Sequence, residues 1–510
     1  MAHKQVSFKT YHQHQMSLLP PSLDELITAD HPVRVVHEVI ETIDIDNLLA
    51  QYKGGGSSSF HPRMLLKVLV YSYLCNTYSS RKIEAAIKEN IHFMWLAGMA
   101  RPDHNTINRF RAEKLGKVLK HVFGQVVALL VESGHVSLQE AYLDGTKIEA
   151  NANRYSFVWG KSIKTSKERI QKQLEELWKY AQQVASEEMK DTQPLTFDKI
   201  DAEKVKQTVA QINEALKDKP VDKKVQQKLK YGEKHWPENL NKYEQQEQVL
   251  NGRNSYSKTD KGATFMRMKE DHMGNGQLKP GYNWQISTGS QYILNYTIHQ
   301  NPTDTTTLPA HMEQFKQLYG KLPETLVADS GYGSQQNYEY LEQNNVEAYV
   351  KYGYFHKEQS GEHLKKHPFH QDHLHYNEQQ DRFYCPIGQA MELVEEKTKK
   401  TDNGYKQKIK VYQAKNCTGC PLAGVCHKAD GNRRIEVNHE LKKYKQQARQ
   451  KLLSEEGIRY RKKRPADVEA VFGNIKHNHG FKRFMLRGIE KVEIEAGLLA
   501  IAHNLRKRAA

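Results

Sequence analysis

Hydrophobic positions in the first 120 residues recur at helical spacing. Apolar side chains repeat every three or four residues in 32–41 and 62–74, and a Gly/Ser loop at 54–59 separates the two segments. A short helix, a turn at Gly98 and a second helix over 103–111 follow, which is the layout of a helix-turn-helix DNA-binding motif. The same pattern also fits a helical domain whose helices only pack against one another and do not bind DNA.

The pattern further along is typical of strands that alternate with helices. It predicts strand 136–144, hairpin 282–298, helix 305–318, strand 323–329, helix 337–343 and strand 346–350. Two of these strands are expected to end in an aspartate, Asp144 and Asp329. This order of elements indicates a mixed α/β sheet.

Two segments interrupt the sheet pattern. Residues 161–248 are rich in Lys, Glu and Gln with few aromatics, which favours heptad-like helices, for example a coiled hairpin. Residues 351–410 are polar, with six histidines between 356 and 375. Helices are predicted again over 453–476 and 492–507.

Length and charge narrow the class of protein. A chain of 510 residues has room for three or more domains. Its net charge of +16 favours a polyanionic partner. The first 19 residues contain no apolar core of a secretory signal, and no stretch of about 18 apolar residues occurs. We therefore expect a cytosolic protein with no membrane partner.

Three acidic residues are candidates for a shared metal site. Asp144 and Asp329 follow strands, and Glu469 lies on the late helix. Carboxylates bind Mg²⁺, and two such ions can promote phosphodiester cleavage or transfer. Each aspartate alone could also be a turn-former. Glu493 and Glu495 are alternative third carboxylates on a different helix.

Four of the five cysteines are close in sequence and suggest a second metal site. The predicted ligands of one structural Zn²⁺ are Cys385, Cys417, Cys420 and Cys426, with His427 as a substitute ligand. Reduced cysteines without a metal are the alternative. Metal binding by His370, His373 and His375 is also open, although an exposed polar linker is the favoured interpretation.

Three blocks around the acidic residues resemble known sequence signatures. Residues 142–152, 327–334 and 468–484 look like the signature blocks of bacterial DDE insertion-sequence transposases, within the broad IS-four/IS-five-like assemblage. Residues 18–111 are similar to the helical N-terminal domain of the same proteins. The resemblance also includes a four-cysteine insertion, so it extends over nearly the whole chain except the Lys/Glu/Gln-rich segment.

The resemblance implies an α+β or α/β multidomain fold. A helical, helix-turn-helix-like DNA-binding domain would span 1–125, and an RNase H-like mixed-sheet catalytic core would combine 136–160, 255–350 and 453–510. A charged helical insertion would occupy 161–254, and a small zinc-ribbon-like insertion 351–452. The catalytic carboxylates and magnesium ligands would be Asp144, Asp329 and Glu469.

The resemblance also implies residues that contact DNA. Related transposases have a Tyr, Arg, Glu, Lys pattern on the last helix, and Glu469 and Lys476 have its Glu–Lys spacing. Tyr460 and Arg464 are out of register with this pattern. The predicted DNA-binding residues are Lys476, Arg464, Lys482, Arg483, Arg487, Asn105, Asn108, Arg109 and Arg111. Surface solvation is the alternative role for the basic residues.

Residues near the acidic motifs are weaker candidates. Lys147, Asn151 and Asn153 could face the substrate or cap the segment after the strand. Ser330, Tyr332 and Ser334 could donate hydrogen bonds to phosphate oxygens, or serve only the Gly-Tyr-Gly turn. Asp304 is predicted to be a helix N-cap.

The implied function is cut-and-paste DNA transposition with two Mg²⁺ or Mn²⁺ ions. The DNA partners would be terminal inverted repeats and target DNA, joined in a complex with a transposase homodimer, in a bacterial, nucleoid-associated location. The alternatives are a transposase-derived DNA-binding protein without turnover and a plain metal-dependent nuclease.

Overall fold

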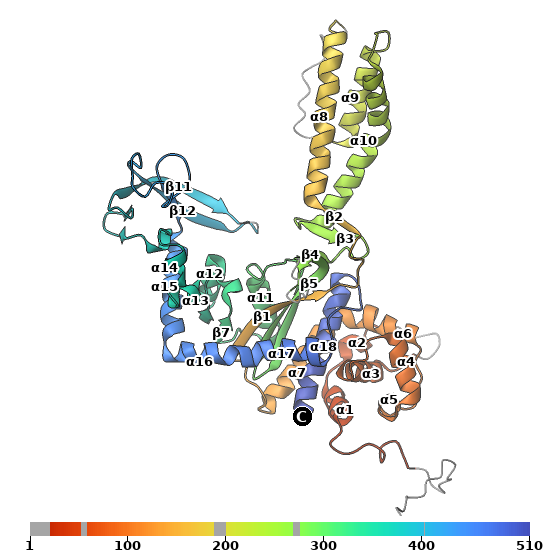
Figure 1. Ribbon diagram of the computed structural model, residues 1–510. Coiled ribbons are helices and arrows are strands. Elements are labelled where there is room, and N and C mark those ends of the chain that lie inside the picture. Colours follow the sequence, from red (N-terminus) through yellow and green to blue (C-terminus); the bar gives the residue numbers. More distant parts are fainter. Residues whose placement is uncertain (1–20, 53–58, 188–199, 269–275, 402) are drawn as a thin grey trace, which may run out of the picture. The chain divides into compact units, whose positions relative to one another are not determined.

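The computed structural model describes residues 21–52, 59–187, 200–268, 276–401 and 403–510 (Figure 1). The chain divides into two compact units, one formed by the residues up to Val126 with Leu498–Ala510, the other by Val127–Gly497. None of the described helices has the length and apolar character needed to cross a membrane.

The first unit is helical, as its apolar periodicity predicts. Its helices are α1 (Pro32–Thr42), α2 (Asp46–Leu49), α3 (Pro62–Leu74), α4 (Ser80–Glu89), α5 (Ile91–Leu96) and α6 (His104–Arg109). A π-helical turn, Phe110–Lys114, and a 3-10 turn, Leu115–Lys117, follow α6. The side chain of Asp103 caps α6 by accepting from the Thr106 N–H at 2.8 Å. Two long helices, α7 (Leu119–Glu132) and α18 (Ile489–Ala509), contain residues of both units.

A mixed six-stranded sheet is the centre of the second unit. Its strands are β1 (Glu140–Glu149), β4 (Thr264–Arg267), β5 (Leu278–Gly289), β6 (Tyr292–His299), β7 (Thr325–Ala328) and β8 (Glu347–Val350). The order is β4-β5-β1-β7-β8, and β6 also pairs with β5. The β5–β6 hairpin and the β1–β5 pair are antiparallel, whereas β7 pairs in parallel with both β1 and β8. The predicted mixed sheet is confirmed.

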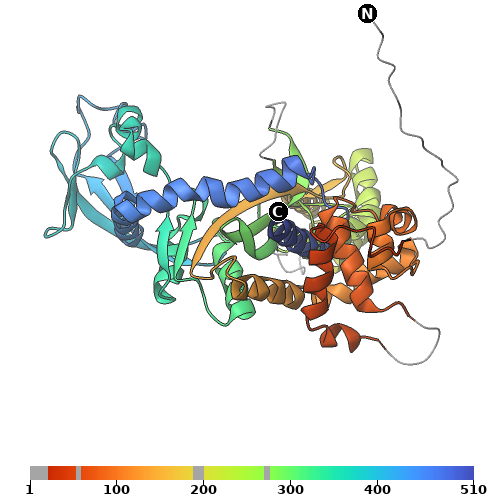
Figure 2. The same cartoon turned by 90° about the horizontal axis from the view of Figure 1, so that it is seen from below.

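Further helices connect these strands and lie beside them. They are α11 (Leu308–Tyr319), α12 (Gln335–Gln343), α13 (Phe355–Gln359), α14 (Glu362–Lys366), α15 (His439–Leu453), α16 (Glu455–Arg464) and α17 (Ala470–Gly473). Figures 1 and 2 show α16 and the helical turns after it as one rod that runs along the main sheet. The predicted helix over 453–476 therefore forms, with a corner at Ser454 where α15 ends.

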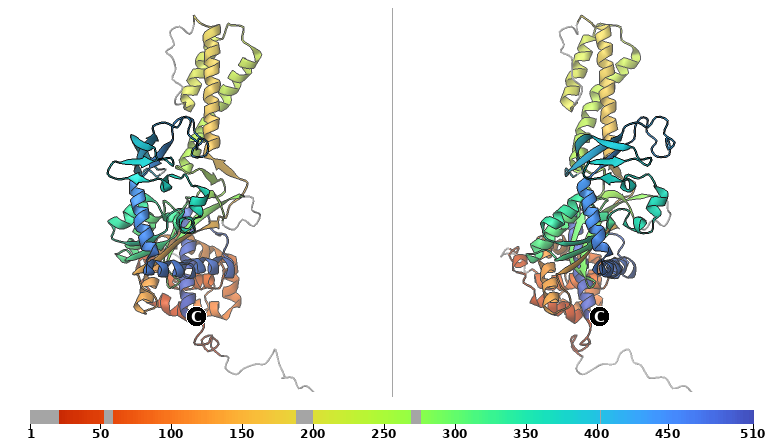
Figure 3. Two further views of the ribbon diagram at one scale, coloured as in Figure 1. Left: turned by 60° about the vertical axis from the view of Figure 1, so that its left-hand side comes forward. Right: turned by 90° about the vertical axis from the view of Figure 1, so that its left-hand side faces the viewer.

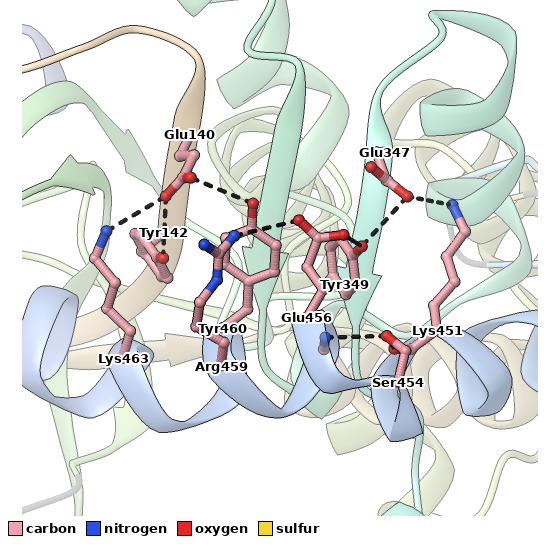
Figure 4. Close-up of polar contacts among 11 residues, drawn as sticks. Glu140, Tyr142, Glu347, Tyr349, Lys451, Ser454, Glu456, Arg459, Tyr460 and Lys463 are labelled. Carbon is pink, nitrogen blue, oxygen red and sulfur yellow. Dashed lines mark hydrogen bonds and ion pairs between the residues drawn. The ribbon is translucent and has the colours of Figure 1, made fainter.

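Polar contacts hold α16 against the strands (Figure 4). Tyr460 and Lys463 both contact the carboxylate of Glu140, which begins β1, at 3.3 Å. One helical turn earlier, Glu456 accepts a 2.9 Å hydrogen bond from the hydroxyl of Tyr349 on β8. These contacts fix where α16 crosses the sheet, and therefore where the residues after it lie.

The described residues of the Lys/Glu/Gln-rich segment are helical, as predicted, but they form three helices instead of the two of a hairpin. The helices are α8 (Gly160–Val184), α9 (Ala202–Ala215) and α10 (Lys223–Leu250), and they lie side by side in both views of Figure 3. They share one apolar core that includes Leu174, Val209 and Trp236. The short pair β2 (Phe157–Trp159) and β3 (Ser255–Ser257) joins the two ends of the segment.

A second sheet forms after the main sheet. It is antiparallel with order β13-β12-β11-β10-β9, and its strands are β9 (Tyr376–Asn377), β10 (Arg382–Tyr384), β11 (Ala390–Lys400), β12 (Lys406–Ala414) and β13 (Arg434–Val437). Phe383 and Tyr412 are buried in its core. Of the three histidines predicted to lie in an exposed linker, His373 and His375 are exposed and His370 is half-buried, whereas the neighbouring His363 is 1% exposed and contacts His373 at 2.8 Å.

Candidate active site

The pairing of β1 with β7 places two aspartates next to each other. Leu143 lies opposite Ala328 in the parallel pair, so Asp144 and Asp329 follow at adjacent positions. Asp144 is not at the end of its strand as predicted. β1 continues to Glu149 because it keeps its antiparallel partner β5, whereas β7 ends at Ala328. Asp329 instead accepts from the Gly331 N–H at 2.8 Å and shapes the turn after β7.

The guanidinium of Arg464 lies among all three acidic side chains. Its Nη2 is 3.3 Å from Oδ2 of Asp144 and 3.8 Å from Oδ2 of Asp329, and its Nη1 is 2.7 Å from Oε1 of Glu469. The arginine side chain is 5% exposed, whereas that of Glu469 is 51% exposed. Arg464 therefore joins Asp144 on β1 and Asp329 in the turn after β7 to the late helix, and it compensates the negative charge of these carboxylates.

A π-helical turn makes the contact between Arg464 and Glu469 possible. Residues five apart lie about 140° apart around an α-helix and so point in different directions. Pro465–Glu469 is instead a π turn, closed by the Ala470 N–H donating to the Pro465 carbonyl. The wider turn brings Arg464 and Glu469 onto the same side of the helix. Arg464 therefore reaches Glu469 although its position in the sequence is out of register with the Tyr, Arg, Glu, Lys pattern.

The acidic residues open onto one pocket of about 360 Å³. Its lining also includes Thr146, Lys476 and His477. Three carboxylates are suitable donors for Mg²⁺. Within the described ranges, however, no group of three or more Asp, Glu, His or Cys side chains is arranged to hold a metal ion. The donor chemistry fits Mg²⁺, while Arg464 holds the carboxylates in the arrangement seen.

Two models of known protein families match the chain, one in its N-terminal part and one in its C-terminal part. The family model "Transposase DDE domain" matches residues 384–509, and "Transposase domain (DUF772)" matches residues 21–113. Both matches are to transposase domains, and together they support a bacterial DDE insertion-sequence transposase. No curated protein and no solved structure matches it. Transposases act on DNA, and a transposase DDE domain is typical of nucleic-acid-cleaving enzymes.

A buried hydrogen-bond network lies beside the acidic residues of the transposase. The carboxylate of Asp304 accepts from Asn283 and from Gln285, each at 2.7 Å, and Gln285 accepts from the hydroxyl of Tyr332. Gly145 leaves room for this network, because a Cβ there would lie 2.1 Å from the Gln285 amide. Burial, and then the charges of Asp304 and of Asp144, raise the pKa of Tyr332.

The structure gives three of the weaker candidates roles other than those predicted. Thr307, not Asp304, is the N-cap of α11, so the capping prediction for Asp304 is wrong. Tyr332 is fully buried and its hydroxyl is engaged by Gln285, so it does not face a substrate. Ser334 caps α12 by accepting from the Asn337 N–H at 3.3 Å.

The other weak candidates near the first motif support the local structure. Asn151 donates to the Met485 carbonyl at 2.7 Å and accepts from Arg483. Asn153 accepts from the Tyr155 N–H at 2.8 Å. Glu495, an alternative third carboxylate, is fully buried and accepts from two backbone N–H groups outside the pocket.

The predicted DNA-binding residues have unequal access to solvent. Asn105, Asn108 and Arg109 are exposed on α6. Arg111 is 3% exposed and donates to the Tyr78 carbonyl at 2.7 Å, so its predicted contact with DNA is not compatible with its position. Helical spacing next to a π turn does not indicate which face of the helix is buried, so the sequence did not predict the burial of Arg111.

Basic residues on the late segment also differ in exposure. Lys476 is 7% exposed and lines the pocket. Lys482, Arg483 and Arg487 are all exposed, and the two arginines also donate to the backbone carbonyls of Ala150 and Asn151. The two arginines thus hold the segment that follows β1.

The four clustered cysteines line one small cavity together with His427. N–H groups point at three of the sulfurs: Gln389 N–H donates to Cys385 at 3.3 Å, and Arg433 donates to Cys417 and to Cys426. The structure therefore brings the predicted ligands together. They do not form a metal-binding arrangement within the described part of the chain.

One basic residue near the carboxylates was missed by sequence analysis. Lys351 directly follows β8 and lies opposite the position after β7 that Asp329 occupies. The signal was available, since the strand 346–350 was predicted and Lys351 comes immediately after it.

Proposed function

We propose that this transposase moves an insertion sequence by a cut-and-paste reaction that depends on Mg²⁺ or Mn²⁺. The observation that supports this most directly is the convergence of Asp144, Asp329 and Glu469 on one pocket. The two transposase families matched at either end of the chain support the DNA substrate. The six-stranded sheet, in which β1, β4 and β6 pair antiparallel with β5 while β7 and β8 are added in parallel, supports an RNase H-like core.

The three carboxylates are the residues that would hold two metal ions. When bound, the ions would supply activation of water and stabilisation of the leaving oxygen. Arg464 keeps the carboxylates close together despite their like charges, since its guanidinium contacts all three. The buried ammonium of Lys476 would offset the charge of the phosphate that enters the pocket.

The proposed reaction has two displacement steps at phosphorus. Water attacks the phosphodiester at the element end, the bond from phosphorus to the 3′ oxygen breaks, and a 3′-hydroxyl is released with a 5′-phosphate. That hydroxyl then attacks a target phosphodiester, its proton passes to solvent, and the 3′ oxygen of the target strand leaves. Asp144, Asp329 and Glu469 serve both steps, and no covalent enzyme intermediate forms.

Recognition of the element ends is proposed for the first unit. The exposed Asn105, Asn108 and Arg109 on α6 supply side chains suited to base edges and phosphates. Two ends must be brought together for transposition, which suits a homodimer in the DNA complex. Because the substrate is bacterial DNA, we propose a cytoplasmic, nucleoid-associated location.

A structural Zn²⁺ bound by Cys385, Cys417, Cys420 and Cys426 is also proposed. N–H donors directed at the sulfurs would stabilise the thiolate form that zinc requires. Metal analysis of protein purified without chelator tests this. We expect one zinc per chain, lost in Cys417→Ser but retained in Cys75→Ser; no zinc in the native protein would refute the site.

The transposition proposal is tested with a labelled duplex that carries the terminal repeat flanking the gene. Wild type with Mg²⁺ should nick the repeat end and join it to a second duplex. Asp329→Asn should bind the duplex but lose both reactions, and Asp218→Asn, which removes an exposed carboxylate of the helical insertion, should keep them. Equal binding without cutting by all three proteins would favour a DNA-binding protein without turnover. Cutting without joining would favour a nuclease.

A further inference from the structure

Lys351 extends the row of side chains formed by Asp144 and Asp329. Val350 on β8 lies opposite Ala328 on β7, which in turn lies opposite Leu143 on β1. The N–H of Lys351 also donates to the Ala328 carbonyl at 3.3 Å. Lys351 therefore comes directly after β8, just as Asp329 comes directly after β7. Both residues lie at the strand ends that face the site.

The backbone of Lys351 is held by a close approach. A Cβ on Gly333 would lie 2.4 Å from the Lys351 carbonyl oxygen and 2.8 Å from Cα of Tyr352, so only glycine allows this contact. Gly333 belongs to the turn that begins at Asp329. The same turn therefore fixes both an acidic residue of the site and the lysine beside it.

Among the described residues, the ammonium group of Lys351 has no counter-ion of its own. It is half-buried, and no carboxylate among the described residues forms an ion pair with it. Burial lowers the pKa of Lys351, and the charge of Arg464 lowers it further, while Asp329 and Glu469 act in the opposite direction. A cation close to the active site is thus left without a direct partner.

Arg461 supplies a second cation in the same place. Its guanidinium lies 5.3 Å from the ring centroid of Phe355, and its Nε is buried without a hydrogen-bond partner. Lys351 and Arg461 both lie close enough to His356 to lower its pKa, after the larger effect of burial. Two basic side chains without carboxylate partners in the described structure thus gather beside Asp329.

We propose that Lys351 and Arg461 bind a DNA backbone phosphate that flanks the phosphodiester being cut. This inference rests on the proposed function and adds a phosphate contact to it. Neither residue lines the pocket formed by the three carboxylates, whereas Lys476 does, so the phosphate is a neighbour of the one that reacts. An arginine next to a lysine provides charge-assisted hydrogen bonds suited to phosphate oxygens.

The test is the salt dependence of binding to the terminal-repeat duplex, measured without divalent ions. Lys351→Gln and Arg461→Gln should each weaken binding and make the slope of log K against log salt shallower by about one. Lys351→Arg should restore the slope. Lys321→Gln is the matched control, because Lys321 is exposed and precedes the opposite end of β7.

A second measurement locates the phosphate. Single methylphosphonate substitutions along the duplex remove one charge at a time. One position close to the cut should weaken binding by the wild type but not by Lys351→Gln. Thermal unfolding of each variant shows whether its fold is intact. If Lys351→Gln does not fold, the comparison is made with Lys351→Arg, which keeps the positive charge.

Two results would overturn the inference. Unchanged salt slopes in the glutamine variants, with the wild type binding normally, would mean that the two cations do not contact DNA. Tighter Mn²⁺ binding by Lys351→Gln with an unchanged slope would mean that Lys351 only balances the charge of Asp329 and Glu469. A wild type that binds but does not cut would count against the proposed function and leave the slope comparison valid.

Discussion

At the scale of single residues, Arg464 decides how the acidic side chains are arranged. Its buried guanidinium contacts Asp144, Asp329 and Glu469, and the last two are partly open to solvent. Removing one partner of a buried charge cluster is costly because the remaining charges lose their compensation. A divalent cation at the same carboxylates would supply comparable compensation.

Arg464→Gln should lower the free energy of unfolding by about 3 kcal/mol, since three like charges would remain without their shared cation. Mg²⁺ should then stabilise the variant more than the wild type. Urea unfolding with and without Mg²⁺ measures both effects. Lys462→Gln, which removes an exposed cation from the same helix, is the control. Equal stabilisation by Mg²⁺ in both proteins would contradict the prediction.

Asp381, in the second sheet, gives a pH-dependent prediction. Burial raises the pKa of Asp381, but hydrogen bonds from Lys410, Tyr412 and Tyr376 outweigh it and lower the pKa from 3.8 to about 2. The ionised carboxylate therefore stabilises the folded state above pH 3.8, and this contribution is lost as the pH falls through about 2.

Asp381→Asn should lower the melting temperature at pH 7, and the difference from wild type should shrink as the pH falls from about 4 to about 2. Thermal unfolding at several pH values measures the difference. Asp430→Asn, which removes an exposed carboxylate, should show no such pH dependence. A difference that stays constant down to pH 2 would contradict the assigned cause.

At the scale of elements, the π turn Pro465–Glu469 sets the register between α16 and the residues of the site. Asp467 lies in this turn, is 3% exposed, and accepts from Thr288 Oγ1 at 2.7 Å and from the Gln291 N–H at 3.1 Å. The turn is thereby attached to the β5–β6 hairpin, at a distance from the pocket.

Asp467→Ala should destabilise the protein by about 1–3 kcal/mol, because a buried hydroxyl and a backbone N–H lose their acceptor. It should also reduce the rate of DNA cleavage, although Asp467 does not line the pocket. Asp467→Asn retains an acceptor oxygen and should recover most of the rate. Comparing cleavage rates at saturating DNA distinguishes positioning from loss of binding; a rate unchanged in Asp467→Ala would exclude the positioning role.

At the scale of the whole molecule, parts of the chain have separate apolar cores. The helices α8, α9 and α10 share a core of their own, and the β2–β3 pair brings the two ends of the insertion together. Trp159 pairs with Ser255, so the two ends of the insertion lie next to each other. The segment between them can therefore be replaced by a short linker.

Replacing residues 160–254 by a short Gly/Ser linker should leave a folded protein that still contains the main sheet. The excised segment 155–258 should form helices alone, because its core residues lie within it. Circular dichroism of both proteins and thermal unfolding of the shortened chain measure this. A shortened chain that is unfolded at 25 °C would show that the insertion stabilises the core.

The sequence predicted many individual elements but not how distant residues meet. The β5–β6 hairpin and α11 follow from local periodicity and turn residues, and both form close to the expected positions. The number of helices in the insertion did not follow from the sequence, because its polar composition does not show where one helix ends and another begins. Burial of Arg111 and of Tyr332 was missed because burial depends on partners far away in the chain.

The sequence by itself determined the helical first segment, the strand-rich core and the order of the three acidic motifs, because periodicity and residue type act over short stretches. The tertiary structure alone decided that Asp144 lies inside β1 next to Asp329, and that a π turn carries Arg464 to Glu469. It also placed Lys351 in the same row. Strand register and helix register depend on contacts between distant segments, so no local pattern encodes them.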